Sequence, residues 1–282
     1  MMRLGYAVRL LSAAFGVLVP CYGKPMTSEI DELITKKDWR AVEVARKSGP
    51  PIVTTVEPYL RNQDAVIRLL AVDCISAAGG PNAPPLLINM LKDVNEQVRI
   101  NSINALHEHP PVGREQALLA AWDADHTHDG FVRQQIPMIL GRMHARATAP
   151  DLHHRLAAEA RQDIKDGLIA GLAKMGDAPA RAEFGKMLHD ARGKRTAELI
   201  EYVKYLDEPW VIPLLVPVLG RRDIAIDLST HRTSLKRREC DLAVDEVLRI
   251  SKAKFAFELD EIAQYTDAQI AEVVRYAQAQ PK

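Results

Sequence analysis

A short pattern recurs along this chain and limits what the chain can fold into. It is a basic residue, preceded in its first four copies by an apolar one, with an apolar or aromatic residue seven positions later. The basic residues are Arg68, Arg99, Arg133, Lys165, Arg195 and Arg237, at intervals of 31, 34, 32, 30 and 42 residues. Positions seven apart share one face of an α-helix. A period of this length predicts a stack of similar helical units.

A second set of helices is predicted ahead of the first, because several apolar segments open with proline. Proline suits the first turn of a helix, where its missing N–H would be unpaired anyway. The low share of aromatic residues, 5%, also favours helices over strands. The predicted segments are residues 84–91, 150–160, 179–188 and 209–219.

Together the two sets predict an all-α fold, an α-solenoid or α-α superhelix of about six helix pairs. A lone pair cannot bury its apolar face, so stacked pairs must share one continuous core. We assign residues 50–254 to the repeats, 24–49 to N-terminal capping helices and 255–282 to a C-terminal capping segment. An amphipathic helix from Asp267 to Ala279 is predicted to close the C-terminal end.

Three segments resemble the second-helix signature of HEAT repeats: Asp64-x-x-Ile67-Arg68, Asn95-x-x-Val98-Arg99 and Asp129-x-x-Val132-Arg133. The resemblance spans residues 50 to 250, although Arg161 and Ala191 replace the acidic position in the next two repeats. It implies a curved superhelix in which acidic and basic positions form a polar ladder between successive repeats. The implied ladder residues are Asp64, Arg68, Asn95, Arg99, Asp129, Arg133, Lys165 and Arg237.

The N-terminus has the features of a signal peptide. Arg3 and Arg9 form a charged segment ahead of an apolar stretch at residues 10–19, and Cys21-Tyr22-Gly23 has the small-x-small pattern of a cleavage site. We therefore expect residues 1–23 to be removed and the protein to be periplasmic or secreted. A short membrane anchor, or translation from Met26, is the alternative. Anchoring as a lipoprotein at Cys21 is disfavoured, because Pro20 stands where a small residue is usual.

Charge narrows the class of partner. The chain has 37 basic and 37 acidic side chains, and loss of Arg3 and Arg9 would leave 35 against 37. Such a balance gives no overall attraction to nucleic acid or to an anionic membrane, so we expect neither as a partner. No later apolar stretch approaches the length of a bilayer span, so no membrane span is expected in the mature chain.

Standard catalytic and cofactor motifs are missing from the sequence, and we expect no cofactor. His126, His128 and Asp125 are weak candidate metal ligands in a polar turn, but a polar turn is what any helix pair needs. Cys74 and Cys240 fall at apolar helix positions and are expected as buried free thiols. Asp241, next to Cys240, is expected to be exposed or to cap its helix.

The sequence therefore predicts a monomeric scaffold without catalysis of its own, which binds a protein or peptide through the concave face lined by the second helices. The long turn at residues 220–235 adds a basic surface to this face. Candidate partner-binding residues are Asn101, Asn104, Gln134, Arg221, Arg222, Arg232 and Arg238.

Enzymatic alternatives remain open, because HEAT-like proteins include bilin lyases and alkylpurine DNA glycosylases. DNA repair needs a basic groove rich in aromatic residues, whereas this chain is neutral and has three tryptophans. Metal-dependent hydrolysis at residues 123–129 is a further alternative.

Overall fold

The structure is a computed structural model that describes residues 26–125, 130–227, 229, 235–262 and 264–280. The predicted signal segment and the residues Asp129, His126, His128 and Arg232 lie outside this range. Over the described residues the chain forms fifteen α-helices, four short 3-10 helices and one two-stranded antiparallel sheet. The predicted all-α fold of consecutive helix pairs is confirmed.

Seven second helices stack side by side and form what we call the inner row. They are α2 (Arg40–Ser48), α4 (Ala65–Ala78), α6 (Glu96–Glu108), α8 (Phe131–Arg142), α10 (Gln162–Met175), α12 (Lys194–Leu206) and α14 (Glu239–Ser251). Among them, α4, α6, α8, α10 and α12 each carry one of the periodic basic residues near the N-terminal end.

The first helices form the outer row. They are α1 (Met26–Thr35), η1 (Pro50–Ile52) with α3 (Val53–Val56) and η2 (Glu57–Arg61), α5 (Ala83–Met90), α7 (Glu115–Ala124), η3 (Arg146–Thr148) with α9 (Ala149–Ala158), α11 (Ala178–Asp190), and η4 (Pro209–Leu215) with α13 (Val216–Leu219). The last helix, α15 (Asp267–Gln278), buries Ile270, Val273 and Ala277 against the end of the stack, as its amphipathic pattern predicted.

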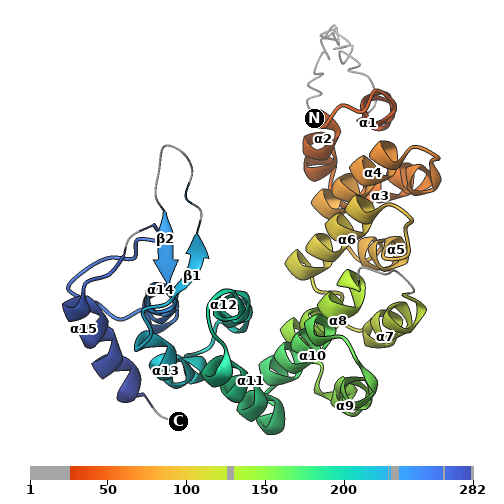
Figure 1. The fold of residues 1–282 in the computed structure, drawn as a ribbon. Helices are drawn as coiled ribbons and strands as arrows, with labels where there is room; N and C mark the ends of the chain where they lie inside the picture. The colour runs from red at the N-terminus through yellow and green to blue at the C-terminus, as the bar shows by residue number, and fades with distance from the viewer. Residues whose placement is uncertain (1–25, 126–129, 228, 230–234, 263, 281–282) are drawn as a thin grey trace, which may run out of the picture.

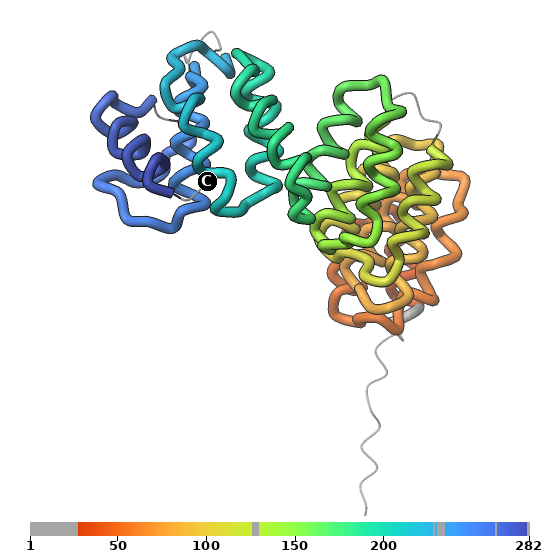
Figure 2. Tube along the Cα trace, turned by 90° about the horizontal axis from the view of Figure 1, so that it is seen from below, coloured from red at the N-terminus to blue at the C-terminus, as the bar shows by residue number. Residues whose placement is uncertain are grey.

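The stack bends into an arch with two arms (Figure 1). We call α1 to α10 the first arm and α11 to α15 the second arm. Seen from below, the arms are two lobes that meet where α10 leads into α11 (Figure 2). Among the described residues, no helix is both long and apolar enough to span a bilayer.

The sixth repeat differs from the prediction, which placed Arg237 in a second helix. Instead, β1 (Ile224–Asp227) and β2 (Lys236–Arg238) pair as an antiparallel hairpin, and α14 begins only at Glu239. The helix starts there because Arg238 and Asp241 form a reciprocal capping box. The hairpin accounts for the longer interval between the last two basic residues.

Helices α8 and α10 approach each other unusually closely, because three glycines lie at their contact. A Cβ atom at Gly167 would lie 2.2 Å from the carbonyl oxygen of Gln134, and one at Gly171 would lie 2.2 Å from that of Pro137. A Cβ at Gly141 would lie 2.1 Å from the hydroxyl of Tyr205. Only glycine permits this backbone contact, which fixes the geometry at the end of the first arm.

Pro137 lies inside α8 and leaves one backbone carbonyl without its helical partner. Proline has no N–H to donate to the residue four positions earlier, which is Arg133. The indole nitrogen of Trp122 on α7 donates to this carbonyl at 2.8 Å instead. The proline therefore links the inner row to the outer row in this repeat. Cys74 and Cys240 are buried free thiols, as predicted.

Candidate partner-binding groove

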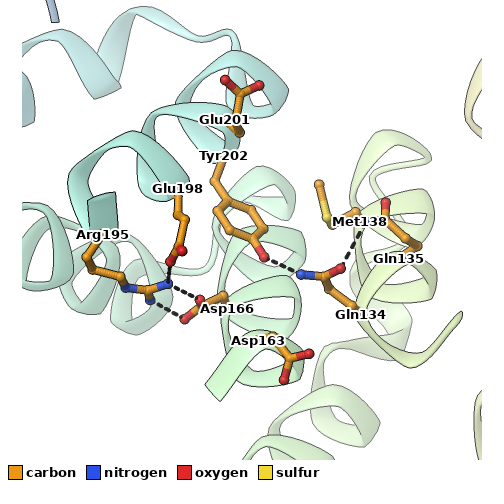
Figure 3. Close-up of a pocket in the computed structure, with 9 residues that line it drawn as sticks. All are labelled: Gln134, Gln135, Met138, Asp163, Asp166, Arg195, Glu198, Glu201 and Tyr202. Carbon is orange, nitrogen blue, oxygen red and sulfur yellow. Dashed lines mark hydrogen bonds and ion pairs between the residues drawn. The ribbon is translucent and has the colours of Figure 1, made fainter. Parts of the chain in front are cut away.

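A cavity of about 390 Å³ opens on the inner row where the two arms meet (Figure 3). Helix α12 packs much less closely on α10 than α8 does, so side chains rather than backbone line the space between them. The lining residues are Gln134, Gln135 and Met138 from α8, Asp163 and Asp166 from α10, and Arg195, Glu198, Glu201 and Tyr202 from α12. We call this the junction cavity.

Two tyrosines of α12 hold the junction cavity in shape by reaching past α10 to α8. The amide of Gln134 donates to the Tyr202 hydroxyl at 2.8 Å, and the Tyr205 hydroxyl donates to the Met138 carbonyl at 2.7 Å. Burial raises the pKa of both phenols, so they stay neutral at ordinary pH. Tyr202, which lines the cavity, gives its wall an aromatic face with a polar edge, a combination common at protein interfaces.

A buried ion pair closes one end of the junction cavity. Arg195 approaches Asp166 at 2.7 Å, and Gln162 donates to the same carboxylate at 2.8 Å. The hydrogen bond to Asp166 is the main reason that the pKa of Arg195 is raised. Because Asp166 is buried and fully paired, its charge holds α10 and α12 together rather than facing a ligand (Figure 3).

The rim of the junction cavity is acidic and about half exposed. Asp163, Glu198 and Glu201 form it, and each has a basic neighbour on its own helix or in the preceding turn. The side chains of this cavity can form ion pairs and hydrogen bonds with a ligand and can pack against its apolar parts. In the part of the chain that the structure describes, no group of three His, Cys, Asp or Glu side chains could hold a metal ion.

Of the predicted partner-binding residues, the structure brings only Gln134 into the junction cavity. Asn101 lies further along the inner row, where its amide donates to Asp73 of α4 at 2.8 Å. Asn104 is exposed on α6. The tyrosines and the acidic rim were not among the predicted residues, because residues as far apart as Gln134 and Tyr202 share no local pattern.

The predicted basic surface is largely used within the fold. Arg221 is mostly buried and donates to the carbonyls of Ala191 and His189. Arg238 binds Asp241 and the Tyr265 carbonyl. Arg222 is partly exposed and pairs with Asp267 of α15, while Arg232 lies outside the described residues. These contacts fasten the hairpin to α14 and α15.

The predicted ladder has other acidic partners than expected. Arg68 binds Asp93 of the next repeat through two hydrogen bonds of 2.7 Å, and Arg133 binds Glu159 of the next repeat. Asp64 and Asn95 cap their own helices, by accepting from the N–H of Val66 and of Val98. Asp64 also pairs with Lys37 of the preceding unit at 2.5 Å.

Asp93 and Glu159 belong to a periodic set of polar residues that the predicted ladder did not include. Asn62, Asp93, Asp125 and Glu159 recur at 31, 32 and 34 residues, in the turn before each second helix. This polar position lies outside the periodic helix and was therefore overlooked. Asp125, a predicted metal ligand, occupies it.

The other predicted ladder residues, Arg99, Arg237 and Lys165, differ in the groups that they contact. Arg99 donates to the carbonyls of Asp93 and Val94, and Arg237 binds Asp245 at 2.7 Å. Lys165 is half-buried on α10.

Comparison with known proteins supports the fold. No protein-family model and no curated protein matches the chain. A solved structure of the complex of CpcE and CpcF of phycocyanin lyase from Nostoc sp. PCC7120 matches with a TM-score of 0.50 at 12% identity, covering 96% of this chain and 100% of that one.

Two engineered proteins also align with the chain. One has a TM-score of 0.34 at 15% identity, covering 90% of this chain and 72% of that one. The other has a TM-score of 0.30 at 14% identity, covering 90% and 95%. The helix pairs and the first of these three matches together give the chain a HEAT-like helical-repeat fold.

Proposed function

We propose that this HEAT-like helical-repeat protein is an exported scaffold that binds a protein or peptide partner along its inner row, without catalysis of its own. The observation that carries this proposal is the junction cavity, which combines an aromatic wall, two amides and an acidic rim in one open space. Interfaces favour such a mixture of aromatic and polar groups at their centre.

The position of the cavity supports a binding role. It lies where the arch bends, so a partner could contact both arms at once (Figure 1). Contact with both arms increases the area that a partner can bury, and a stable interface needs a large buried area. The similar structure from Nostoc is itself a complex of two proteins, which agrees with a binding role for this fold.

A crosslinking experiment tests this role. A photo-crosslinking amino acid replaces Asn104 or Glu201 on the inner row, and in control proteins it replaces Glu183 or Glu29 on the outer row. We expect the inner positions to give discrete crosslinked adducts with a partner. An excess of unmodified protein should suppress these adducts by competing for the partner. Equal yields from both rows, or none from the inner row, would contradict the proposal.

Export is tested separately by cell fractionation and N-terminal sequencing. Cleavage after Gly23 gives a chain that begins at Lys24 and lies outside the cytoplasm. A cytoplasmic chain that begins at Met1 or Met26 would remove this part of the proposal while leaving the binding role intact.

A second candidate function is that of a lyase-type accessory protein. Its support is the likeness to the phycocyanin lyase complex over nearly the whole of both chains. If the chain acts in this way, mixing it with a bilin and an apo-phycobiliprotein should produce a covalent adduct with a shifted absorbance spectrum. An unchanged spectrum would leave the scaffold as the function to pursue.

A further inference from the structure

Two neighbouring cavities of the inner row, both lined by α12, have an acidic character that the whole chain does not have. The chain has equal numbers of acidic and basic side chains. The junction cavity, in contrast, is lined by the carboxylates of Asp163, Asp166, Glu198 and Glu201, with Arg195 as its only basic lining residue among those described. Because Arg195 is engaged by Asp166, the accessible rim is negative.

A second cavity, of about 230 Å³, adjoins the first and has the same sign. Glu201 lines both cavities, so the two are neighbours on α12. The carboxylates of Asp245, Glu246 and Glu261 also line the second cavity, together with Lys204 and Arg237. Its walls include apolar side chains of β1, α12 and α14. We call the two cavities together the acidic groove.

Two carboxylates of the acidic groove are buried, and each pairs with one arginine, Asp245 with Arg237 and Glu246 with Arg249. Burial is the main cause that raises the pKa of Asp245 and of Glu246, even though Arg237 and Arg249 lie beside them. In the first arm, burial likewise raises the pKa of Asp73, which lines another inner-row cavity together with Glu108, Arg46 and His109. A cation supplied by a partner would stabilise each of these charges.

The exposed rim carboxylates are available to such a cation. Glu201 pairs with Lys204 at 2.8 Å, and Glu198 lies 3.8 Å from Lys194 and 3.2 Å from Arg195. Most of these are contacts between exposed side chains within one helix, which contribute little free energy. A partner's lysine or arginine can replace them at small cost.

We propose that the acidic groove binds a lysine- and arginine-rich segment of the partner protein. Its basic side chains pair with the rim carboxylates, and their aliphatic stems pack on Met138 and Tyr202. A cation over the Tyr202 ring would add a cation–π contact. This inference rests on the proposed scaffold function and specifies the chemistry of its partner.

Fluorescence anisotropy with three labelled peptides tests this inference. The peptides are short and equal in length, and they alternate serine with lysine, glutamine or glutamate. We expect the lysine peptide to bind the full chain and the other two not to bind. Binding should weaken as salt rises from about 50 to about 300 mM, because the contacts are partly exposed ion pairs.

Matched charge variants locate the site. The double variant Glu198→Gln, Glu201→Gln should weaken binding of the lysine peptide by about tenfold. The double variant Glu29→Gln, Glu183→Gln makes the same change in net charge on the outer row, and it should alter binding by less than about twofold. All four glutamates are exposed or half-buried, and thermal unfolding checks that each variant folds.

Three results would overturn the inference: no binding of the lysine peptide, equal binding of the glutamate peptide, or equal losses in the two double variants. None of these would remove the scaffold function, because the crosslinking experiment does not depend on the charge of the partner. Absence of inner-row adducts together with binding of the lysine peptide would instead remove the scaffold function alone.

Discussion

The two arms of the arch bury charge in different ways. In the first arm, buried arginines near the start of second helices bind polar groups in the turns, as Arg68 does with Asp93. In the second arm, α14 buries four carboxylates within two turns: Glu239, Asp241, Asp245 and Glu246. Each binds an arginine: Arg221, Arg238, Arg237 and Arg249, respectively.

This difference shows how the repeat changes along the chain. Repeats of the first arm meet through apolar surface and need few polar contacts each. In the second arm the hairpin replaces the start of a helix, and its strands and the preceding turn bring arginines over α14. The second arm therefore depends more on a network whose loss would leave buried charges unpaired.

The largest expected effect comes from removing a carboxylate of that network. Asp241 accepts from Arg238, from its own N-cap N–H and from the N–H of Tyr265, and is fully buried. We expect Asp241→Ala to lower the free energy of unfolding by about 3–5 kcal/mol. The matched variant Asp93→Ala in the first arm should cost about 1–3 kcal/mol, since Arg68 keeps two backbone acceptors.

Urea unfolding followed by circular dichroism measures both variants. If Asp93→Ala costs as much as Asp241→Ala, the two arms do not differ in their dependence on buried charge, and the comparison fails.

The glycine contact in the first arm gives the next effect. Gly171→Ala places a methyl group against the Pro137 carbonyl, so α8 and α10 must separate. We expect this to lower the free energy of unfolding by about 2–3 kcal/mol. Gly185→Ala in α11 of the second arm meets only the flexible side chain of Leu214 at 3.1 Å. It should be neutral or stabilising by up to about 1 kcal/mol, because alanine favours the helix. Thermal unfolding measures both variants. Equal changes in melting temperature would show that the backbones of α8 and α10 are not in close contact.

A titration in the first arm gives a smaller effect. Burial lowers the pKa of His107 from 6.5 to about 4, despite its contact with Gln135. The unfolded chain therefore binds more protons between pH 6.5 and pH 4, so the folded state loses stability as the pH falls through this window. The loss should be about 2 kcal/mol once partial exposure is allowed for.

Urea titrations of the wild type and of His107→Gln at pH 7 and pH 4.5 test this effect. The variant should lose less stability than the wild type between the two values. Other titrating groups, such as Asp73, are present in both proteins and cancel in the comparison. Equal losses would contradict the assignment to His107.

The smallest effect concerns the link between the arms. Tyr205→Phe removes the hydroxyl that donates to the Met138 carbonyl and should cost about 1 kcal/mol. Hydrogen exchange of α12 should rise while exchange of α4, far from the junction, stays unchanged. A rise in both helices would indicate general destabilisation rather than a looser junction.

Much of the fold was predictable because helices leave a local pattern. The helix predicted at Asp267–Ala279 lies at Asp267–Gln278, and the proline-opened segments are all helical in the structure. Each of these elements depends on neighbours within a few turns, which a periodic pattern records. The hairpin was missed because its two short strands lie inside a long polar turn.

The candidate site was less predictable. Gln134 was expected to contact a partner, and it does line the junction cavity. Tyr202, Glu198 and Glu201 were not expected, because they join Gln134 only through the bend between the arms. Arg221 and Arg238 looked available to a partner in the sequence, but the structure uses them to bind buried carboxylates.

The sequence by itself determined that this chain is a stack of helix pairs, because apolar residues at helical spacing leave each pair with a face that only a neighbouring pair can cover. Only the tertiary structure decided where the stack bends and which side chains the bend gathers. The glycines of α8 and α10 and the tyrosines of α12 act across repeats, through contacts between residues such as Met138 and Tyr205 that lie far apart in the chain. A local pattern cannot encode such contacts, and the acidic groove depends on them.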